Sequence, residues 1–163
     1  IIVMASSDDS STLSDNFLNY EQLILESSHD IIWPELPENT AAGLCYTSGT
    51  TGNPKGALYS HRSTVLHALT TSLNLGPSLG DGMKVLPVVP LFHVNAWGLP
   101  YAAPLTGTSL IFPGPNLDGA SLFDLMDQEN VNSAWGVPTV WLGLLDEIRK
   151  QERVPSQLSL IHI

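Results

Sequence analysis

The residues best suited to chemistry lie in one short stretch, residues 46–56. It reads Tyr-Thr-Ser-Gly-Thr-Thr-Gly-Asn-Pro-Lys-Gly, with three glycines and one lysine among its hydroxyl residues. Glycines let the main chain turn its N–H groups toward a ligand, hydroxyls add donors, and lysine adds a mobile positive charge. We therefore predict a phosphate-binding loop made by Thr47, Ser48, Gly49, Thr50, Thr51, Gly52 and Lys55.

The segments on either side indicate how this loop is held. Residues 41–46 are mostly apolar and predict a buried strand, and residues 57–59 can continue as extended chain. Ser60 is a suitable N-cap for a helix over about residues 61–74. One face of that helix carries Val65, Leu66, Leu69 and Leu73. The loop thus leaves the end of a strand, where α/β folds place ligands.

A Walker-type nucleotide loop, Gly-x-x-x-x-Gly-Lys-Ser/Thr, is the nearest comparison, and two positions depart from it. Counting from Gly49, Pro54 stands where the second glycine belongs, and Gly56 where the Ser/Thr belongs. Proline removes an N–H donor, and glycine offers magnesium no hydroxyl. A Walker-type NTPase is therefore disfavoured. A polar surface turn is the simpler alternative, but the lysine and the flanking strand and helix favour phosphate binding.

The same stretch resembles the signature loop of the AMP-forming, adenylate-forming ligase superfamily, which includes acyl-CoA synthetases, luciferases and the adenylation domains of peptide synthetases. A second segment of the family pattern is Pro-Leu-Phe-His-Val-Asn-Ala-Trp-Gly-Leu-Pro-Tyr, residues 90–101. Shorter matches occur at residues 59–64, 85–90, 113–115 and 135–142. The resemblance covers about residues 31–158 and is greatest to bacterial medium- or long-chain fatty-acid–CoA ligases.

This resemblance implies a reaction in two halves. A fatty-acid carboxylate attacks the α-phosphate of ATP to give acyl-AMP and pyrophosphate, and the sulfur of coenzyme A then displaces AMP to give a thioester. It implies ATP, magnesium and coenzyme A as cofactors or co-substrates, with Lys55 and His93 as catalytic residues. Thr50 and Thr51 would meet magnesium through the phosphates. Activation of an aryl or amino acid, or a non-catalytic nucleotide-binding fragment, remains an alternative.

His93 allows three interpretations. It can be a core or capping histidine, or a metal ligand, although no other histidine or carboxylate lies within nine residues of it. By resemblance it lies between the phosphates and the acyl carboxylate. The resemblance also implies a substrate pocket made by His93, Val94, Asn95, Trp97, Gly98, Gly136, Pro138 and Thr139. Trp97 is predicted to plug or gate the acyl tunnel, with ordinary packing as the alternative for these residues.

Composition limits the partners. The net charge is −10, and residues 39–117 carry Lys55, Arg62 and Lys84 against Asp81 alone. An acidic chain with a locally basic loop disfavours nucleic-acid binding. The single cysteine, Cys45, is predicted to be a buried structural thiol rather than a catalytic one. No apolar run approaches the ~20 residues of a membrane helix. A cytoplasmic location is the default expectation, and a homodimer is one of the oligomeric states left open.

Strand and helix segments alternate along the chain, which predicts an α/β fold with a mainly parallel sheet and packed helices. Expected strands span residues 84–89, 108–112 and 131–135, and the apolar run at residues 158–163 predicts one more. Expected helices span residues 17–25, 94–105 with a kink at Pro100, 118–129 and 138–150. Residues 5–15 predict a surface loop. By resemblance, residues 1–163 form a partial N-terminal, AMP-binding domain, truncated at both ends and inactive on its own because essential downstream motifs are missing.

Overall fold

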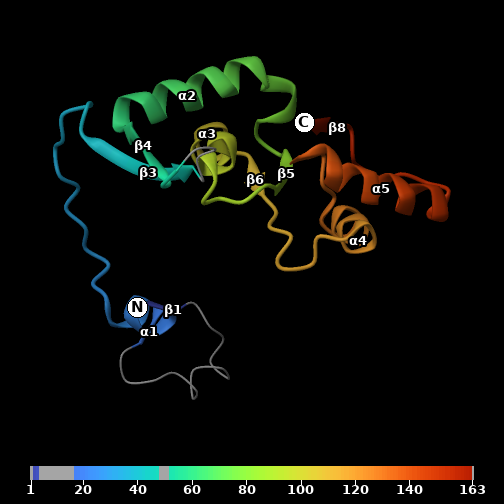
Figure 1. Cartoon of the computed structure of the whole chain (residues 1–163), viewed down its shortest axis with the longest axis horizontal. Coiled ribbons are helices and arrows are strands. Elements are labelled where there is room, and N and C mark those ends of the chain that lie inside the picture. The colour runs from blue at the N-terminus through green and yellow to red at the C-terminus, as the bar shows by residue number, and fades with distance from the viewer. Residues whose placement is uncertain (1, 4–16, 48–51, 163) are drawn as a thin grey trace. The chain divides into compact units, whose positions relative to one another are not determined.

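The computed structural model describes residues 2–3, 17–47 and 52–162, which belong to two compact units, Ile1–Leu36 and Pro37–Ile163 (Figure 1). In the smaller unit, β1 (Ile2–Val3) pairs in parallel with β2 (Leu18–Asn19), and α1 (Tyr20–Glu26) follows. The helix expected over residues 17–25 is present but begins at Tyr20, where Asn19 caps it by accepting the Gln22 N–H at 3.1 Å. The surface loop expected at residues 5–15 lies outside the described residues.

The larger unit contains a parallel sheet of β5 (Lys84–Val88), β6 (Ser109–Leu110), β7 (Ser133–Gly136) and β8 (Leu160–His162). The strands lie in the order β6-β5-β7-β8, and every neighbouring pair is parallel. The α/β class with a mainly parallel sheet is therefore confirmed. The expected strands at residues 108–112 and 131–135 are also present, as β6 and β7, with shifted bounds.

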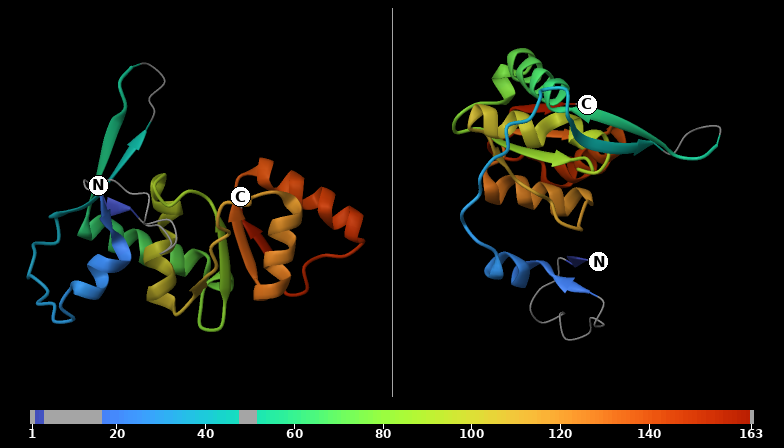
Figure 2. Two further views of the ribbon diagram at one scale, coloured as in Figure 1. Left: turned by 90° about the horizontal axis from the view of Figure 1, so that it is seen from below. Right: turned by 90° about the vertical axis from the view of Figure 1, so that its left-hand side faces the viewer.

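Helices cover both faces of this sheet (Figures 1 and 2). On one face lie α2 (His61–Asn74) and α3 (Leu99–Thr106), and on the other lie α4 (Gly119–Glu129) and α5 (Pro138–Gln151). Successive strand residues point to opposite faces, so Val85 packs with the α2–α3 side while Leu86 packs with the α4–α5 side. A short turn of helix, η2 (Gly76–Ser78), leads from α2 toward β5.

The helix termini follow from their capping residues. Ser60 accepts the Ser63 N–H at 3.1 Å while the Ser63 hydroxyl lies 3.0 Å from the Ser60 nitrogen, a reciprocal capping box. Asp118 accepts the Ser121 N–H and hydroxyl at the start of α4, and these bonds lower the pKa of Asp118. Both predicted N-caps are confirmed.

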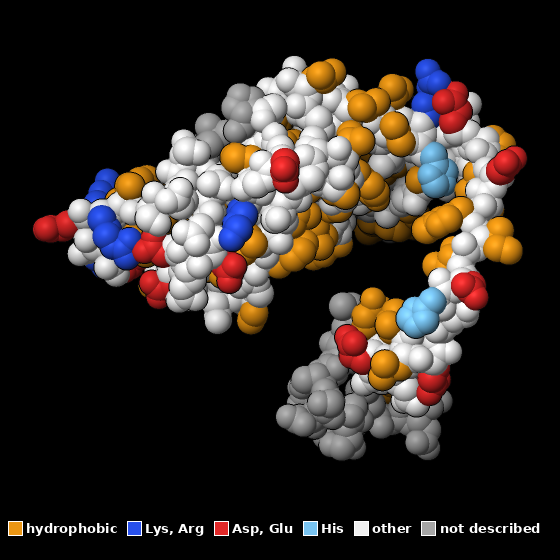
Figure 3. All heavy atoms as spheres, turned by 180° about the vertical axis from the view of Figure 1, so that it is seen from behind, with side chains coloured by type: hydrophobic (Ala, Val, Ile, Leu, Met, Phe, Trp, Pro, Cys, Tyr) orange, Lys and Arg blue, Asp and Glu red, His pale blue; other side chains and the backbone are white. Residues whose placement is uncertain are grey.

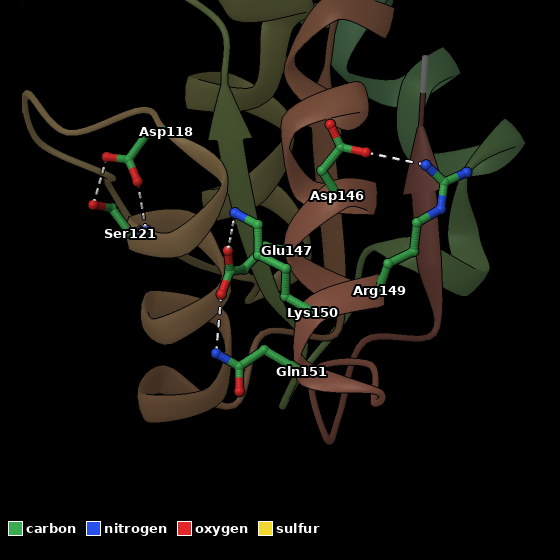
Figure 4. A network of polar contacts seen from close by, with 7 residues as sticks. All are labelled: Asp118, Ser121, Asp146, Glu147, Arg149, Lys150 and Gln151. Carbon is green, nitrogen blue, oxygen red and sulfur yellow. Dashed lines mark hydrogen bonds and ion pairs between the residues drawn. The ribbon is translucent and has the colours of Figure 1, made fainter.

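The last turn of α5 carries a polar network (Figure 4). Glu147 is 8% exposed and accepts from Gln151 at 2.9 Å and from Lys150 at 3.2 Å. These two hydrogen bonds lower the pKa of the Glu147 carboxyl. Asp146 accepts from Arg149 at 3.0 Å, an exposed pair of the kind that contributes little to stability. Arg149 and Lys150 thus occupy the helix C-terminus, where positive charge is favourable.

The main chains of α4 and α5 approach each other closely at Gly119 and Gly143. A Cβ atom built on Gly119 would collide with the Gly143 carbonyl. Because the obstacle is backbone, no side-chain rotation would relieve the clash. Glycine at position 119 therefore allows the two helices to lie against each other and to share the core of Leu122, Phe123, Met126 and Leu144, all 0% exposed.

The strand predicted at residues 41–46 is present as β3 (Ala41–Thr47) and pairs antiparallel with β4 (Lys55–Ser60). Its predicted burial is wrong, because Cys45 is the one buried residue of β3. The described part of the predicted phosphate loop therefore lies at the end of a β-hairpin, and α2 follows only after β4. Most of this region's apolar side chains remain exposed, including Leu58 at 68% and Leu73 at 85%. Figure 3 shows apolar side chains, in orange, over the larger unit.

Candidate functional site

The hairpin tip carries the described part of the predicted phosphate loop. Thr47 pairs with Lys55 at the last register position, and the Thr47 hydroxyl donates to the Lys55 carbonyl at 3.5 Å. Thr47, Gly52 and Lys55 are all exposed, and Gly52 has a φ of 149°. Ser48, Gly49, Thr50 and Thr51 lie outside the described residues. The pairing of β3 with β4 brings Thr47 and Lys55 to the same end of the hairpin.

The chemistry of this region suits an anion. No carboxylate occurs between Glu38 and Asp81, an interval that contains the whole hairpin and α2. Arg62, at the start of α2, pairs with Glu38 at 2.6 Å, which leaves Lys55 as the cation at the hairpin tip. Among residues 2–3, 17–47 and 52–162, no group of three acidic, histidine or cysteine side chains is arranged to hold a metal ion. Hydroxyls and a lysine without carboxylates fit a phosphate group.

A second feature lies at the carboxyl ends of β5 and β7. From β5 the chain crosses to β6 on one side, and from β6 it returns to β7 on the other side of β5. This reversal makes β5 and β7 the switch point of the sheet, where ligands bind in open α/β folds. Val88 and Gly136 form the last β5–β7 pair. The chain leaving β5 leads to His93 and Trp97, and that leaving β7 leads to Pro138.

The segment after β5 is not the expected helix. Residues 94–105 were predicted as one helix kinked at Pro100, but the structure has a tight turn, η3 (Val94–Gly98), and α3 begins at Leu99. Val94, Asn95, Ala96 and Trp97 have φ angles of 51°, 48°, 45° and 56°, and Gly98 has 81°. Pro100 lies in the first turn of α3, where its missing N–H is harmless. The prediction was wrong because left-handed backbone at four non-glycine residues has no local sequence signal.

Long-range contacts hold this left-handed turn. L-residues in this conformation cost roughly 1–2 kcal/mol each, so the surroundings must impose it. Ala96 is 0% exposed, and the Cys45 thiol of β3 donates to Asn95 Oδ1 at 3.2 Å. The Trp97 ring lies 6.5 Å from that of Trp135 on β7, at a tilt of 36°. Cys45 is buried, as predicted, and Asn95 is bound to it rather than to its local backbone.

A cavity of about 350 Å³ opens beside the turn. Its lining combines the turn, β4, α2 and α3, and it is mostly apolar, as ligand pockets generally are. The lining residues are Tyr59, Ser63, Thr64, His67, Val94, Asn95, Trp97, Gly98 and Tyr101. The structure therefore brings together four of the predicted pocket residues, those at positions 94, 95, 97 and 98.

The other predicted pocket residues lie elsewhere. His93 is exposed at the start of the turn and does not line this cavity, although its carbonyl accepts the Ala96 N–H at 3.1 Å. Gly136 is buried, and a Cβ there would lie 2.7 Å from the ring of Trp141, so packing explains this glycine. Pro138 and Thr139 are exposed in the first turn of α5. Trp135 and Trp141 are core residues, 1% and 5% exposed.

Sequence reasoning missed five lining residues, of which three lie on α2. His67 lies four residues after Ser63 and three after Thr64, and Thr71 lies four residues after His67. That spacing places them on one face of a helix. This polar stripe is visible in the sequence, but only the apolar positions of α2 were considered in predicting the helix. Those apolar positions, Val65, Leu66, Leu69 and Leu73, are 44–85% exposed.

Comparison with known proteins identifies the family. The model of the AMP-binding enzyme family matches residues 3–162. The chain belongs to this family. It is 52% identical over 145 residues to a medium-chain-fatty-acid–CoA ligase of Ectopseudomonas oleovorans, covering 89% of this chain and 27% of that protein. It is also 52% identical to a 3-methylmercaptopropionyl-CoA ligase of Ruegeria lacuscaerulensis, over 80% of this chain and 24% of that protein. The chain thus spans about a quarter of the length of these relatives.

The fold of this AMP-binding family member has solved counterparts. The O-succinylbenzoate coenzyme A synthetase of Bacillus subtilis, solved in complex with AMP, superposes with a TM-score of 0.74 and 24% identity. The match covers 90% of this chain and 29% of the synthetase. Of the helices described here, none is long and apolar enough to cross a membrane.

Proposed function

We propose that the intact protein is an AMP-forming fatty-acid–CoA ligase. It would activate a fatty-acid carboxylate with ATP to acyl-AMP and then form a thioester with coenzyme A. Within it, this chain would be part of a larger N-terminal, AMP-binding domain, and further catalytic motifs would lie outside residues 1–163. Family membership and the identity to named acyl-CoA ligases support this proposal.

One structural observation supports it: the hairpin that carries the predicted phosphate loop is hydrogen-bonded to the turn that lines the cavity. The Cys45 thiol, two residues before Thr47, donates to Asn95 Oδ1 at 3.2 Å. Tyr59, on the other strand of the hairpin, lines the cavity itself. The predicted anion site and the apolar cavity would thereby share adjoining elements. Joining a polyphosphate to an acid with an alkyl chain requires this combination.

The proposed roles follow from side-chain chemistry. The hydroxyls of residues 47, 48, 50 and 51, the loop N–H groups and Lys55 would hold the phosphates, and each charge-assisted hydrogen bond would contribute roughly 1.5–3 kcal/mol. His93 would donate a hydrogen bond to the reacting carboxylate or phosphate. Magnesium would bind through the phosphates close to Thr50 and Thr51. Gly136 at the end of β7, with Pro138 and Thr139 in the first turn of α5, would border the acid site.

The cavity would hold the alkyl part of the acid. Its volume of about 350 Å³ is at the lower end of the ~300–1,000 Å³ range for ligand sites. A second acid deserves a test because one relative, equally identical to this chain, is named a 3-methylmercaptopropionyl-CoA ligase. That acid is shorter and carries a thioether.

Acid-dependent ATP–pyrophosphate exchange by the full-length protein tests the proposal. The panel contains octanoate, palmitate, 3-methylmercaptopropionate, benzoate and leucine. We expect exchange with a fatty acid and, after coenzyme A is added, its thioester. Exchange with benzoate or leucine alone would assign another acid class to the same chemistry, and no exchange with any acid would reject activation altogether. The expected cytoplasmic location and the oligomeric state stay predictions, to be tested by fractionation and light scattering.

A further inference from the structure

A histidine on α2 also binds the left-handed turn, in addition to the contacts from Cys45 and Trp135. His67 Nε2 lies 3.1 Å from the main-chain carbonyl oxygen of Trp97. A carbonyl oxygen can only accept, so the imidazole N–H must donate in this bond. The tautomer with a proton on Nε2 is therefore the one that fits, and the Thr71 hydroxyl lies 3.5 Å from the same nitrogen.

The same imidazole also packs against the end of the turn. A Cβ built on Gly98 would lie 2.5 Å from His67 Cδ2, so the ring occupies the space that a side chain at position 98 would need. Gly98 has a φ of 81°, which a residue with a side chain adopts only with strain. His67 and Gly98 thus fit each other in shape, and His67 and Trp97 are joined by a hydrogen bond.

His67 approaches the turn from a capped helix, and its own side chain is exposed. It lies in the middle of α2, which begins with a reciprocal capping box at Ser60 and packs against α3. The turn, in contrast, holds four non-glycine residues in left-handed conformation. An element of this kind persists only while its surroundings fix it. Removing the bond from α2 therefore frees the turn more than it disturbs the helix.

The position of the turn determines the shape of the cavity. Trp97 is half-buried, lines the cavity and faces the Trp135 ring at 6.5 Å. His67, on α2, lines the same cavity. A shift of the Trp97 main chain would carry the indole with it and change the space open to an alkyl chain.

We propose that His67 is a positioning residue for acid selection. By binding the Trp97 carbonyl, it determines the position of the Trp97 indole in the cavity wall. That position in turn determines which length of acyl chain fits. This inference rests on the proposed function, because it assumes that the cavity receives the alkyl part of the acid. His67 itself takes no part in the chemical step.

The test uses three variants of the full-length protein. His67→Leu removes the donor and keeps a side chain of comparable bulk. His67→Gln keeps an N–H donor at the reach of Nε2, and His67→Asn carries a donor too short to reach the carbonyl. For each variant, kcat/KM is measured with octanoate and with palmitate, together with the KM for ATP and the thermal unfolding midpoint.

We expect the octanoate-to-palmitate ratio of kcat/KM to change by about tenfold in His67→Leu and to stay within about threefold of wild type in His67→Gln. The KM for ATP should remain unchanged in both. If His67→Leu fails to fold, His67→Asn takes its place with the same expected shift.

Two outcomes would overturn the role of His67: an unchanged ratio in a folded variant without the donor, or a His67→Gln variant that behaves like His67→Leu. The second outcome would make the ring's shape, not its N–H, the determinant. Failure of the proposed function has a different signature, because the wild-type protein would then form no thioester from either acid.

Discussion

The two halves of the larger unit are stabilised in different ways. Around β5, β7, α4 and α5, large apolar side chains such as Leu86 and Leu144 are 0% exposed. Around the hairpin and α2, side chains of the same type stay exposed, as Leu58 and Leu73 do. Among the residues that the structure describes, six non-glycine residues have a positive φ. Four of them belong to η3, beside this second half, and the other two are helix C-caps.

This contrast separates scaffold from site. The sheet and its two C-terminal helices provide a packed support, whereas the hairpin and the turn present exposed groups on strained or extended backbone. Side chains that act on ligands must be reachable, so they gather where packing is incomplete. Substitutions in the first half should therefore affect folding, and substitutions in the second half should affect function.

The largest expected effect is a loss of stability in the scaffold. Leu122→Ala would leave a cavity in a fully buried cluster and lower the free energy of unfolding by about 2–5 kcal/mol. Leu73→Ala is the matched control, because Leu73 is 85% exposed and its truncation should change stability by less than about 0.5 kcal/mol. Urea unfolding of the full-length protein, followed by tryptophan fluorescence, measures both. Equal losses of unfolding free energy in the two variants would contradict the proposed difference between the two halves.

Next comes a loss of function at the hairpin tip. Lys55→Ala should lower acid-dependent pyrophosphate exchange at least about tenfold, because a charge-assisted hydrogen bond to phosphate is removed. The unfolding midpoint should stay near that of wild type, since Lys55 is exposed. Lys150→Ala, an exposed lysine on α5, is the control and should retain normal exchange. Full activity in Lys55→Ala would remove this residue from the mechanism.

A smaller change is expected at the cavity wall. Trp97→Ala should alter the preference among fatty acids by about threefold or more, since part of the lining is removed. The measurement is kcat/KM over acids from butyrate to palmitate. Trp33→Ala, an exposed indole in the smaller unit, is the control. An unaltered profile would leave Trp97 as a packing residue beside Trp135.

The smallest effect concerns acid stability. Asp127 accepts from the Ser156 N–H at 2.8 Å and from Arg153, and these bonds hold the pKa of Asp127 below its ordinary value of 3.8. The stabilisation is complete above that ordinary pKa and disappears as the pH falls through the lowered one. Asp127→Asn should therefore flatten the decline of the unfolding midpoint below about pH 4. Asp124→Asn controls for the lost charge on α4, and the same decline in Asp127→Asn and wild type would contradict the assignment.

Much of the secondary structure was predictable because its signals are local. Ser60 and Asp118 cap their helices as expected, and the apolar run before the loop forms β3. Pro138 begins α5 in the place where a missing N–H does no harm. Each of these features depends on residues within a few positions of one another, so the sequence alone contains the information.

The site was less predictable because its geometry depends on distant partners. Asn95 is bound by Cys45, fifty positions earlier, and Trp97 by His67, thirty positions earlier. Those contacts support a left-handed turn in a segment that resembles a helix by composition. His67 was not predicted because a single histidine on a helix belongs to no recognisable sequence motif. Only the folded chain brings these residues together.

The close approach of Gly119 to Gly143 limits how this chain can diverge. At most exposed helix positions a mutation exchanges one side chain for another with little consequence, but here even an added methyl group would act as a wedge between backbones. Alanine is thus a radical replacement at position 119, although it is the mildest one on standard substitution scales. Engineering that redesigns the outer surface of α4 and α5 should leave this contact point untouched.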